Sequence, residues 1–167
     1  MSRADPAPER FEATRVVDAP AADVFAVLCD PQGHVAIDSS GMLQGASGER
    51  VRGVGDRFVV HMDRESLGDY DLGTYDVTVE IVAFEPDREI AWKVHGRIRP
   101  PLDHVYGYRL EPAPDDRTSV ASYYDWSGIS QHWRDSGVFP VLSRAALRAT
   151  LGILDRTVRR GYPRAAD

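Results

Sequence analysis

Residues 16–31 read VVDAPAADVFAVLCDP, and this stretch passes from the end of a strand directly into a short helix. The residues before the turn, FEATRVVD at 11–18, are rich in β-branched side chains, which is typical of a strand. Pro20 suits the first turn of a helix, and Pro31 predicts its end. The apolar residues between these prolines recur at the spacing of one helical face. The stretch therefore predicts a strand followed by a helix with one buried side.

After a second short helix, the chain shows a β pattern from 42 to 127. A second short helix is predicted over 32–38, and polar and glycine-rich turns then divide the chain into short alternating segments. Because the gaps between segments are short, successive strands are expected to pair as antiparallel neighbours. The predicted strands are 42–47, 56–63, 73–85, 88–96, 103–112 and 118–127.

A long helix is predicted at the C-terminal end, over 138–160, where Gly161 and Pro163 then stop it. Its apolar residues form two adjacent stripes, so it needs a wide apolar partner, and the curved sheet is the candidate. Sheet and helix can touch at their edges and leave a cavity between them. The stripes are Leu142, Ala146, Ala149 and Ile153, and Leu147, Leu151, Leu154 and Val158.

The overall composition is that of one globular domain. The chain has 167 residues and a formal net charge of −6, which argues against a nucleic-acid partner. Its single cysteine, Cys29, is expected to be a small buried apolar residue. The sequence contains no run of about 18 apolar residues, so no membrane span is predicted. We expect a cytoplasmic protein. The predicted domain covers 10–162, between a disordered lead-in at 1–9 and a tail at 163–167.

This order of elements, together with several segments, resembles the START-like superfamily (SRPBCC, Bet v 1-like). The likeness is greatest to its polyketide cyclase/dehydrase and lipid-transport branch. The segments are VVDAPAADVFAVLCDP at 16–31, HVAIDSSG at 34–41, GVGDRFVVHMD at 53–63, FEPDREIAWKV at 84–94, YGYRLEP at 106–112 and TSVASYYDWSG at 118–128. The resemblance implies an α+β helix-grip fold, in which a curved antiparallel sheet of about seven strands wraps around the long C-terminal helix. Two short helices would follow the first strand.

The resemblance leaves three functions open, because the superfamily holds several. The first is binding of a small hydrophobic or aromatic ligand, polyketide-like or lipid-like, in a central cavity. The second is a polyketide cyclase/dehydratase acting in that cavity. The third is a protein-binding module like the chaperone activators of this fold. No cofactor and no metal are expected, and the sequence is compatible with a monomer or a homodimer.

Strand alternation predicts which side chains line the cavity, because successive residues of a strand point to opposite faces. Asp38 and Ser39 are expected at the mouth or the far end of the cavity, whereas Tyr123, Asp125 and His61 should face outward. The predicted lining is Phe58, Val60, Met62, Tyr75, Val77, Trp92, Val94, Tyr106, Tyr108, Tyr124, Trp126, Phe139 and Leu142.

Three side chains are the candidates for chemistry. His104, Tyr106 and Tyr124 could supply a base or acid and a donor for an enolate oxygen, as a cyclase requires. His104 also follows a proline-rich turn at a strand start, where a solvated rim position is the more ordinary expectation. Trp133 and Arg134 fall in the predicted link between the last strand and the long helix, where they could cover one end of the cavity.

Overall fold

The computed structural model describes residues 7–164. Residues 1–6 and 165–167, which make up most of the predicted lead-in and tail, lie outside the described residues. Glu9 is held by the body of the protein, because its carbonyl accepts a hydrogen bond from the Trp126 backbone and its carboxylate lies 2.7 Å from Arg134.

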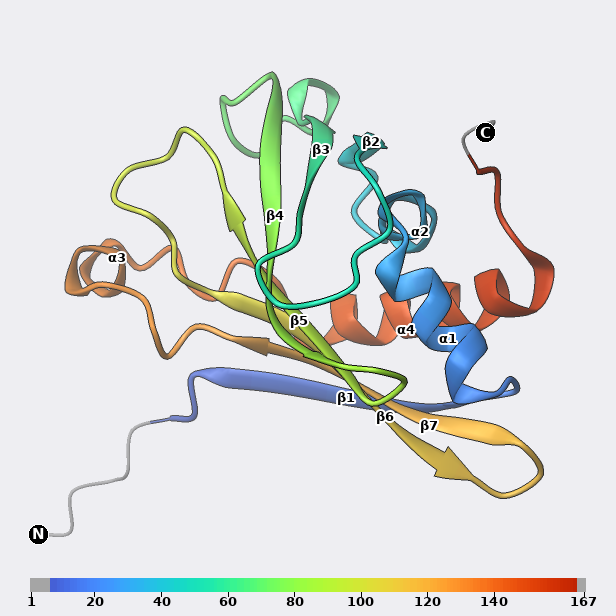
Figure 1. Cartoon of the computed structure of the whole chain (residues 1–167). Helices are drawn as coiled ribbons and strands as arrows, with labels where there is room; N and C mark the ends of the chain where they lie inside the picture. Colours follow the sequence, from blue (N-terminus) through green and yellow to red (C-terminus); the bar gives the residue numbers. More distant parts are fainter. Residues whose placement is uncertain (1–6, 165–167) are drawn as a thin grey trace, which may run out of the picture.

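The sheet has seven strands in the order β1-β7-β6-β5-β4-β3-β2, and every neighbouring pair is antiparallel. The six strands after β1 form a meander, as their short connections predict. β1 pairs with the last strand, β7, and forms one edge of the sheet (Figure 1). The strands are β1 (Arg10–Val17), β2 (Leu43–Ser47), β3 (Arg57–Asp63), β4 (Thr74–Glu85), β5 (Glu89–His95), β6 (Val105–Ala113) and β7 (Arg117–Asp125).

The helices α1, α2 and α4 pack on one side of this twisted sheet, which we call the inner face (Figure 1). The long helix α4 packs against β1 and β7, whereas α2 packs against β2 and β3. This is the α+β helix-grip arrangement, which confirms the predicted fold class. The helices are α1 (Ala21–Cys29), α2 (Pro31–Ile37), the 3₁₀ turn η1 (Glu65–Leu67), α3 (Gln131–Ser136) and α4 (Arg144–Arg160).

The two predicted stripes of α4 differ in burial. Leu147, Leu151 and Leu154 are fully buried and pack into the core, as the second stripe requires. In the first stripe Ala149 is exposed, so the apolar surface of the helix is narrower than predicted. An alanine adds little apolar area and therefore does not by itself decide which side of a helix is covered.

One ion-pair cluster attaches α4 to the edge strand β1. The buried Asp155 accepts hydrogen bonds from Arg15 of β1 at 2.9 Å and from Arg159 of its own helix at 3.0 Å. The pKa of the Asp155 carboxyl lies below its usual value, because the two arginines outweigh the opposing effect of burial. The charged cluster helps to hold the helix against the sheet.

The beginning of the long helix was predicted six residues too early. Residues 138–143 are irregular, and α4 begins at Arg144, after Ser143 caps it by accepting a hydrogen bond from the Ala146 backbone at 3.1 Å. Pro140 explains the late start, because a proline disfavours helical backbone in the residue before it. The short helix α3 was not predicted at all, and it lies in the segment that the sequence assigned to a link.

On the outer face of the sheet, Tyr123 covers a glycine. A Cβ on Gly107 would lie 2.2 Å from Cζ of Tyr123, so the ring occupies the space that any other residue would fill. The Tyr123 hydroxyl donates to Glu89 at 2.8 Å, and the Arg10 guanidinium lies 4.1 Å from the ring centroid. Tyr123 thus faces outward, as predicted, and is nevertheless buried.

Candidate functional site

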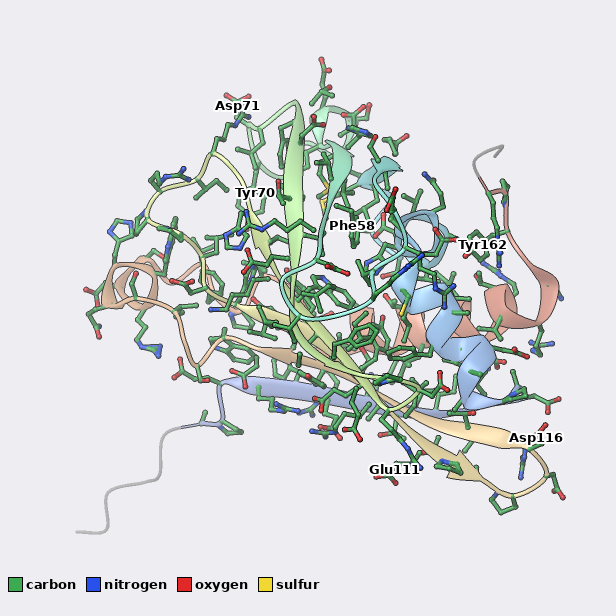
Figure 2. All side chains as sticks on the ribbon, viewed as in Figure 1. Phe58, Tyr70, Asp71, Glu111, Asp116 and Tyr162 are labelled. Atoms are coloured by element: carbon green, nitrogen blue, oxygen red, sulfur yellow. The ribbon has the colours of Figure 1, made fainter. Side chains whose placement is uncertain are left out.

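Burial changes along the inner face from one end to the other. At the end near the β6–β7 hairpin, marked by Glu111 and Asp116 in Figure 2, inward side chains such as Leu110 and Val120 are fully buried. Toward the β3–β4 connection, marked by Tyr70 and Asp71, they are only partly covered. The half-buried side chains at this end are Leu43, Met62, Tyr75, Val77, Val94, Tyr106, Phe139 and Leu142.

Aromatic side chains form a continuous array that extends from this partly covered end into the buried core. Tyr124 lies at its centre, with its ring centroid 5.0 Å from that of Tyr106 and 5.4 Å from that of Trp126. Tyr124 and Trp126 therefore both face inward, as the alternation predicts. We call this array the inner aromatic cluster; its members are Trp92, His104, Tyr106, Tyr108, Tyr124, Trp126, Trp133 and Phe139.

The three residues predicted for chemistry meet inside this cluster. His104 precedes β6, Tyr106 is the second residue of that strand, and Tyr124 pairs directly with Tyr106 across from β7. Nδ1 of His104 lies 2.8 Å from the Tyr124 hydroxyl, and its ring centroid is 5.0 Å from that of Tyr106. The sequence thus identified a trio that the fold brings together.

The expectation of a solvated rim position for His104 was wrong, because only 2% of the residue is exposed. Phe139, in the irregular segment before α4, covers it with ring centroids 5.3 Å apart. A helix beginning at residue 138 would have given this segment a different path, so the sequence could not predict the cover.

Burial also determines the protonation state of the trio. It lowers the pKa of His104 to about 4, against the opposing effect of the Asp103 carboxylate, so the imidazole is neutral at pH 7. Burial likewise raises the pKa of Tyr106 and of Tyr124, so both phenols keep their protons. The site therefore offers neutral hydrogen-bonding groups in an apolar surrounding.

The two nitrogens of the His104 ring differ in their hydrogen bonding within the described part of the chain. Among residues 7–164, Nε2 of His104 is buried without a hydrogen-bond partner. The Tyr124 hydroxyl lies 2.8 Å from Nδ1 of His104, to which it can donate its hydrogen. When the hydroxyl donates in this way, the imidazole proton lies on Nε2, where it is an unpaired donor. A buried unpaired donor is costly, and a ligand oxygen would satisfy it.

Arg64 is a polar member of this end that sequence reasoning missed. Its side chain is only 16% exposed, and its Nε donates to the Tyr75 hydroxyl at 3.2 Å. Its guanidinium also pairs with Asp69 at 2.7 Å and lies close enough to Tyr106 to lower that residue's pKa somewhat against burial. Extending the alternation of β3 beyond Met62 would have placed Arg64 on the inner face.

Helix α3 contributes Trp133, which lies at the edge of the inner aromatic cluster next to Phe139. Its indole Nε1–H lies 3.1 Å from the carbonyl oxygen of Pro100 and 3.2 Å from that of Pro101, and its ring is 6.1 Å from that of Phe139. The neighbouring Arg134 is used structurally, since it donates to Ser127 and pairs with the N-terminal segment. Trp133 is thus a cover of the cluster, and Arg134 anchors the helix that carries it.

Part of the predicted lining is ordinary core. His34 of α2 fills the middle of the inner face, with its ring 4.9 Å from Phe58 and 4.6 Å from Trp92. Phe58, Val60, Trp92 and Tyr108 are all buried, and the rings of Phe58 and Trp92 lie against His34. The remaining predicted positions on the strands and the 139–142 segment lie at the partly covered end or in the aromatic cluster. Tyr124 and Trp126 of this second set are also buried. The positions of the predicted lining that a ligand can reach without rearrangement of the core are therefore the half-buried ones, which are Met62, Tyr75, Val77, Val94, Tyr106, Phe139 and Leu142.

Asp38 and Ser39 do not contribute to the cluster. The Asp38 carboxylate accepts from the backbones of Ser40 and Leu43, at 2.9 and 3.0 Å, and so closes a turn. The Ser39 hydroxyl lies 2.9 Å from that of Thr150 on α4. Asp38 and Ser39 therefore stabilise the turn that follows α2.

Two polar hollows occur on the outer face of the sheet, around Arg109 and Glu111, so neither is the predicted apolar cavity. That central cavity stays a prediction. Within residues 7–164, no three His, Cys, Asp or Glu side chains are grouped as a metal site would require. None of the helices in this range has the length and apolar character needed to cross a membrane.

Comparison with known proteins agrees with this architecture. Residues 8–159 match the polyketide cyclase/dehydrase and lipid transport family. The chain belongs to this family. An uncharacterized protein of Mycobacterium tuberculosis, Rv0088, is 27% identical over 164 residues, which cover 94% of this chain and 67% of the relative.

Solved structures extend the likeness at the level of the fold. Truncated norcoclaurine synthase from Thalictrum flavum aligns with a TM-score of 0.60 at 12% identity, over 97% of this chain and 100% of the other. The Aha1 dimer from Colwellia psychrerythraea aligns with a TM-score of 0.58 at 13% identity, over 92% and 98%. At such low identities, the comparison shows that this chain and these two proteins share the START-like fold, and nothing more.

Proposed function

We propose that this protein binds a small, flat, mostly apolar molecule carrying at least one oxygen, at the partly covered end of the inner face. The observation that carries the proposal is the buried Nε2 of His104, which has no partner among the described residues. A ligand carbonyl, phenol or carboxyl oxygen would accept its hydrogen and remove the penalty of an unpaired donor. Polyketide-like and lipid-like molecules both supply such an oxygen.

The surrounding side chains suit the apolar part of such a ligand. Tyr106, Phe139 and Met62 are only half-buried, so each can bury further apolar area on binding. Aromatic faces also favour flat ligands through stacked or edge-on contacts. Arg64 stands at the same end as a donor for a more acidic oxygen.

The test is a titration of the purified chain with flat aromatic ligands and fatty acids, followed by calorimetry and tryptophan fluorescence. A matched pair of ligands, one with the carbonyl oxygen and one with a methylene in its place, isolates the contribution of His104. We expect His104→Phe to weaken the oxygen-bearing ligand about tenfold, as loss of about 1.4 kcal/mol predicts, and to leave its partner unchanged.

Tyr123→Phe is the matched control, because that hydroxyl lies on the outer face and donates to Glu89. Its ligand affinity should equal that of the wild type. Failure of every ligand in the panel to bind, or equal weakening of both members of the pair by His104→Phe, would refute the proposal.

A second candidate, a cyclase/dehydratase at the same site, is favoured by the 2.8 Å contact between His104 and Tyr124. Enolisation of a poly-β-ketone needs a donor on the carbonyl oxygen and a base at the neighbouring carbon. Nε2–H of His104 can supply the donor on the carbonyl oxygen, with Tyr124 holding the imidazole in place, and water at the partly covered end would take the proton of the neighbouring carbon. Turnover of a poly-β-ketone mimic that persists in both His104→Ala and Tyr124→Phe would exclude this candidate.

The outer face offers little support for the third function, docking of another protein on the sheet. Charged residues in ion pairs cover much of it, including the contacts of Arg109 with Glu12 at 2.9 Å and of Arg10 with Asp125 at 3.5 Å. Among the described large apolar residues that are exposed, Val16 is the one on a strand. A protein-docking face normally presents a contiguous apolar patch.

A further inference from the structure

Three side chains on the outer face of β2, β3 and β4 are hydrogen-bonded in series. The hydroxyl of Ser47 lies 2.8 Å from Nε2 of His61, and Nδ1 of the same imidazole lies 2.7 Å from Oδ1 of Asp76. The residues come from adjacent antiparallel strands and lie on the face opposite the inner aromatic cluster. A serine, a histidine and a carboxylate joined in this order form the nucleophile–base–orienter arrangement of serine hydrolases, which is recognised by geometry and not by sequence order.

Strand register and one glycine create this arrangement. His61 pairs directly with Asp76 on one side and with Gly45 on the other. A Cβ on Gly45 would lie 3.4 Å from Cδ2 of His61, so the missing side chain leaves room for the imidazole to lie over β2. Ser47 is two residues further along β2 and projects to the same face. The imidazole therefore bridges a diagonal pair.

The carboxylate also selects the tautomer that a catalytic base needs. An ionised Asp76 can only accept, so Nδ1 of His61 carries the proton and donates it. In the neutral imidazole Nε2 then holds a lone pair, which can accept the hydrogen of the Ser47 hydroxyl 2.8 Å away. We propose that Ser47 is an activated nucleophile that takes an acyl group from small activated esters, with His61 as its base and Asp76 as a positioning residue.

The proposed reaction is ester hydrolysis in two steps. Oγ of Ser47 bonds to the acyl carbon while His61 takes the hydroxyl proton; the bond to the leaving alcohol breaks, and the alcohol receives that proton. Water then bonds to the acyl carbon while His61 takes one of its protons. The acyl–Ser47 bond breaks, the acid leaves, and Ser47 regains its hydrogen.

The exposure of the three residues limits the substrates. The side chain of His61 is 42% exposed and that of Asp76 is 63% exposed, so a small ester can reach the serine directly. Water also competes for the hydrogen bonds at such a surface, which weakens activation. Small esters with good leaving groups are therefore the expected class, and the activity is independent of ligand binding at the inner face.

Labelling of the full chain with a fluorophosphonate tests the nucleophile, because phosphonylation displaces fluoride and leaves a stable adduct. Peptide mass spectrometry should find one adduct, on Ser47, and Ser47→Ala should abolish it. His61→Ala and Asp76→Asn should slow labelling about a hundredfold, the lower range for general-base assistance, while Asp76→Glu restores it. Hydrolysis of p-nitrophenyl acetate should follow the same order.

His95→Ala is the matched control, since that side chain is also 42% exposed on the same face and contacts a carboxylate, Glu80, at 3.4 Å. It should label at the wild-type rate. Circular dichroism of each variant establishes that it is folded. Absence of an adduct on Ser47, labelling of folded His61→Ala at the wild-type rate, or undiminished ester hydrolysis in Ser47→Ala would overturn the proposal.

Discussion

Removing the Tyr124 hydroxyl should destabilise the protein more than its small size suggests. Tyr124 is fully buried, and its hydroxyl is the partner of Nδ1 of His104 at 2.8 Å. In Tyr124→Phe the imidazole keeps its place but loses this bond. Since Nε2 already has no partner among the described residues, neither nitrogen of the ring would then be satisfied.

The expected loss of stability follows from the cost of a buried unsatisfied group, about 1–3 kcal/mol. For a domain of this size, 1 kcal/mol corresponds to about 2–4 °C in melting temperature. Tyr124→Phe should therefore lower the melting temperature by about 4–8 °C if the loss is about 2 kcal/mol. Tyr123→Phe should cost less, because the Glu89 carboxylate that loses its partner can turn to water.

The assay is urea denaturation of the wild type, Tyr124→Phe, His104→Phe and the double variant. Replacing both partners by apolar rings removes the pair without leaving a polar orphan, so the double variant should be close to the wild type. The coupling energy of this cycle should then be at least about 1 kcal/mol. A Tyr124→Phe variant as stable as Tyr123→Phe, or a coupling energy near zero, would refute the reasoning.

Three further predictions concern stability. Lowering the pH from about 6.5 to about 4 should destabilise the protein, because the fold keeps His34 and His104 neutral with pKa values lowered to about 4, and the unfolded chain takes up their protons first. The free energy of unfolding should fall by an amount on the order of 3 kcal/mol for each histidine, and this loss should be complete near pH 4. Urea midpoints at pH 4.5 and 7 measure the loss. In His104→Phe the loss should be smaller. Gly152→Ala should stabilise α4 by about 0.5–1 kcal/mol, because nothing lies within 4 Å of the added Cβ. Gly107→Ala should destabilise the protein by about 1–3 kcal/mol, because the added Cβ displaces Tyr123. The prediction requires the melting temperature to rise in the first variant and to fall in the second. Asp155→Asn should cost about 1–2 kcal/mol, reduced by the 48% exposure of the Arg15 side chain, and an unchanged melting temperature would show that the cluster does not hold α4 to β1.

The order of the elements could be predicted from the sequence because the residues within each element and its flanking turns indicate its type. The alternation of Phe58, Val60 and Met62 and the short turns between strands depend only on neighbouring residues. So does the apolar stripe of Leu147, Leu151 and Leu154, which the structure confirms as core. Even the inward direction of Tyr124 and Trp126 follows from the two-residue period of a strand.

The environment of those same residues could not be predicted. Whether an inward side chain is sealed core or partly open depends on what covers it, and His34 covers Phe58 and Trp92 from a helix distant in sequence. His104 was expected to be solvated, since its own segment begins a strand after a turn. Phe139 and Tyr124 bury it, and both lie 20 or more residues further along the chain.

The sequence by itself thus determined the order of strands and helices and the inward direction of Tyr124 and Trp126, because periodicity and turn chemistry act over a few residues. The helix-grip fold was implied by the resemblance to the START-like superfamily. Only the tertiary structure decided that Nε2 of His104 is buried without a partner among residues 7–164, that Arg64 lies at the same end, and that Ser47, His61 and Asp76 meet on the outer face. These facts depend on register between strands and on long-range cover. A one-residue shift in the β2–β3 pairing would separate the serine from the histidine and leave the strand pattern unchanged.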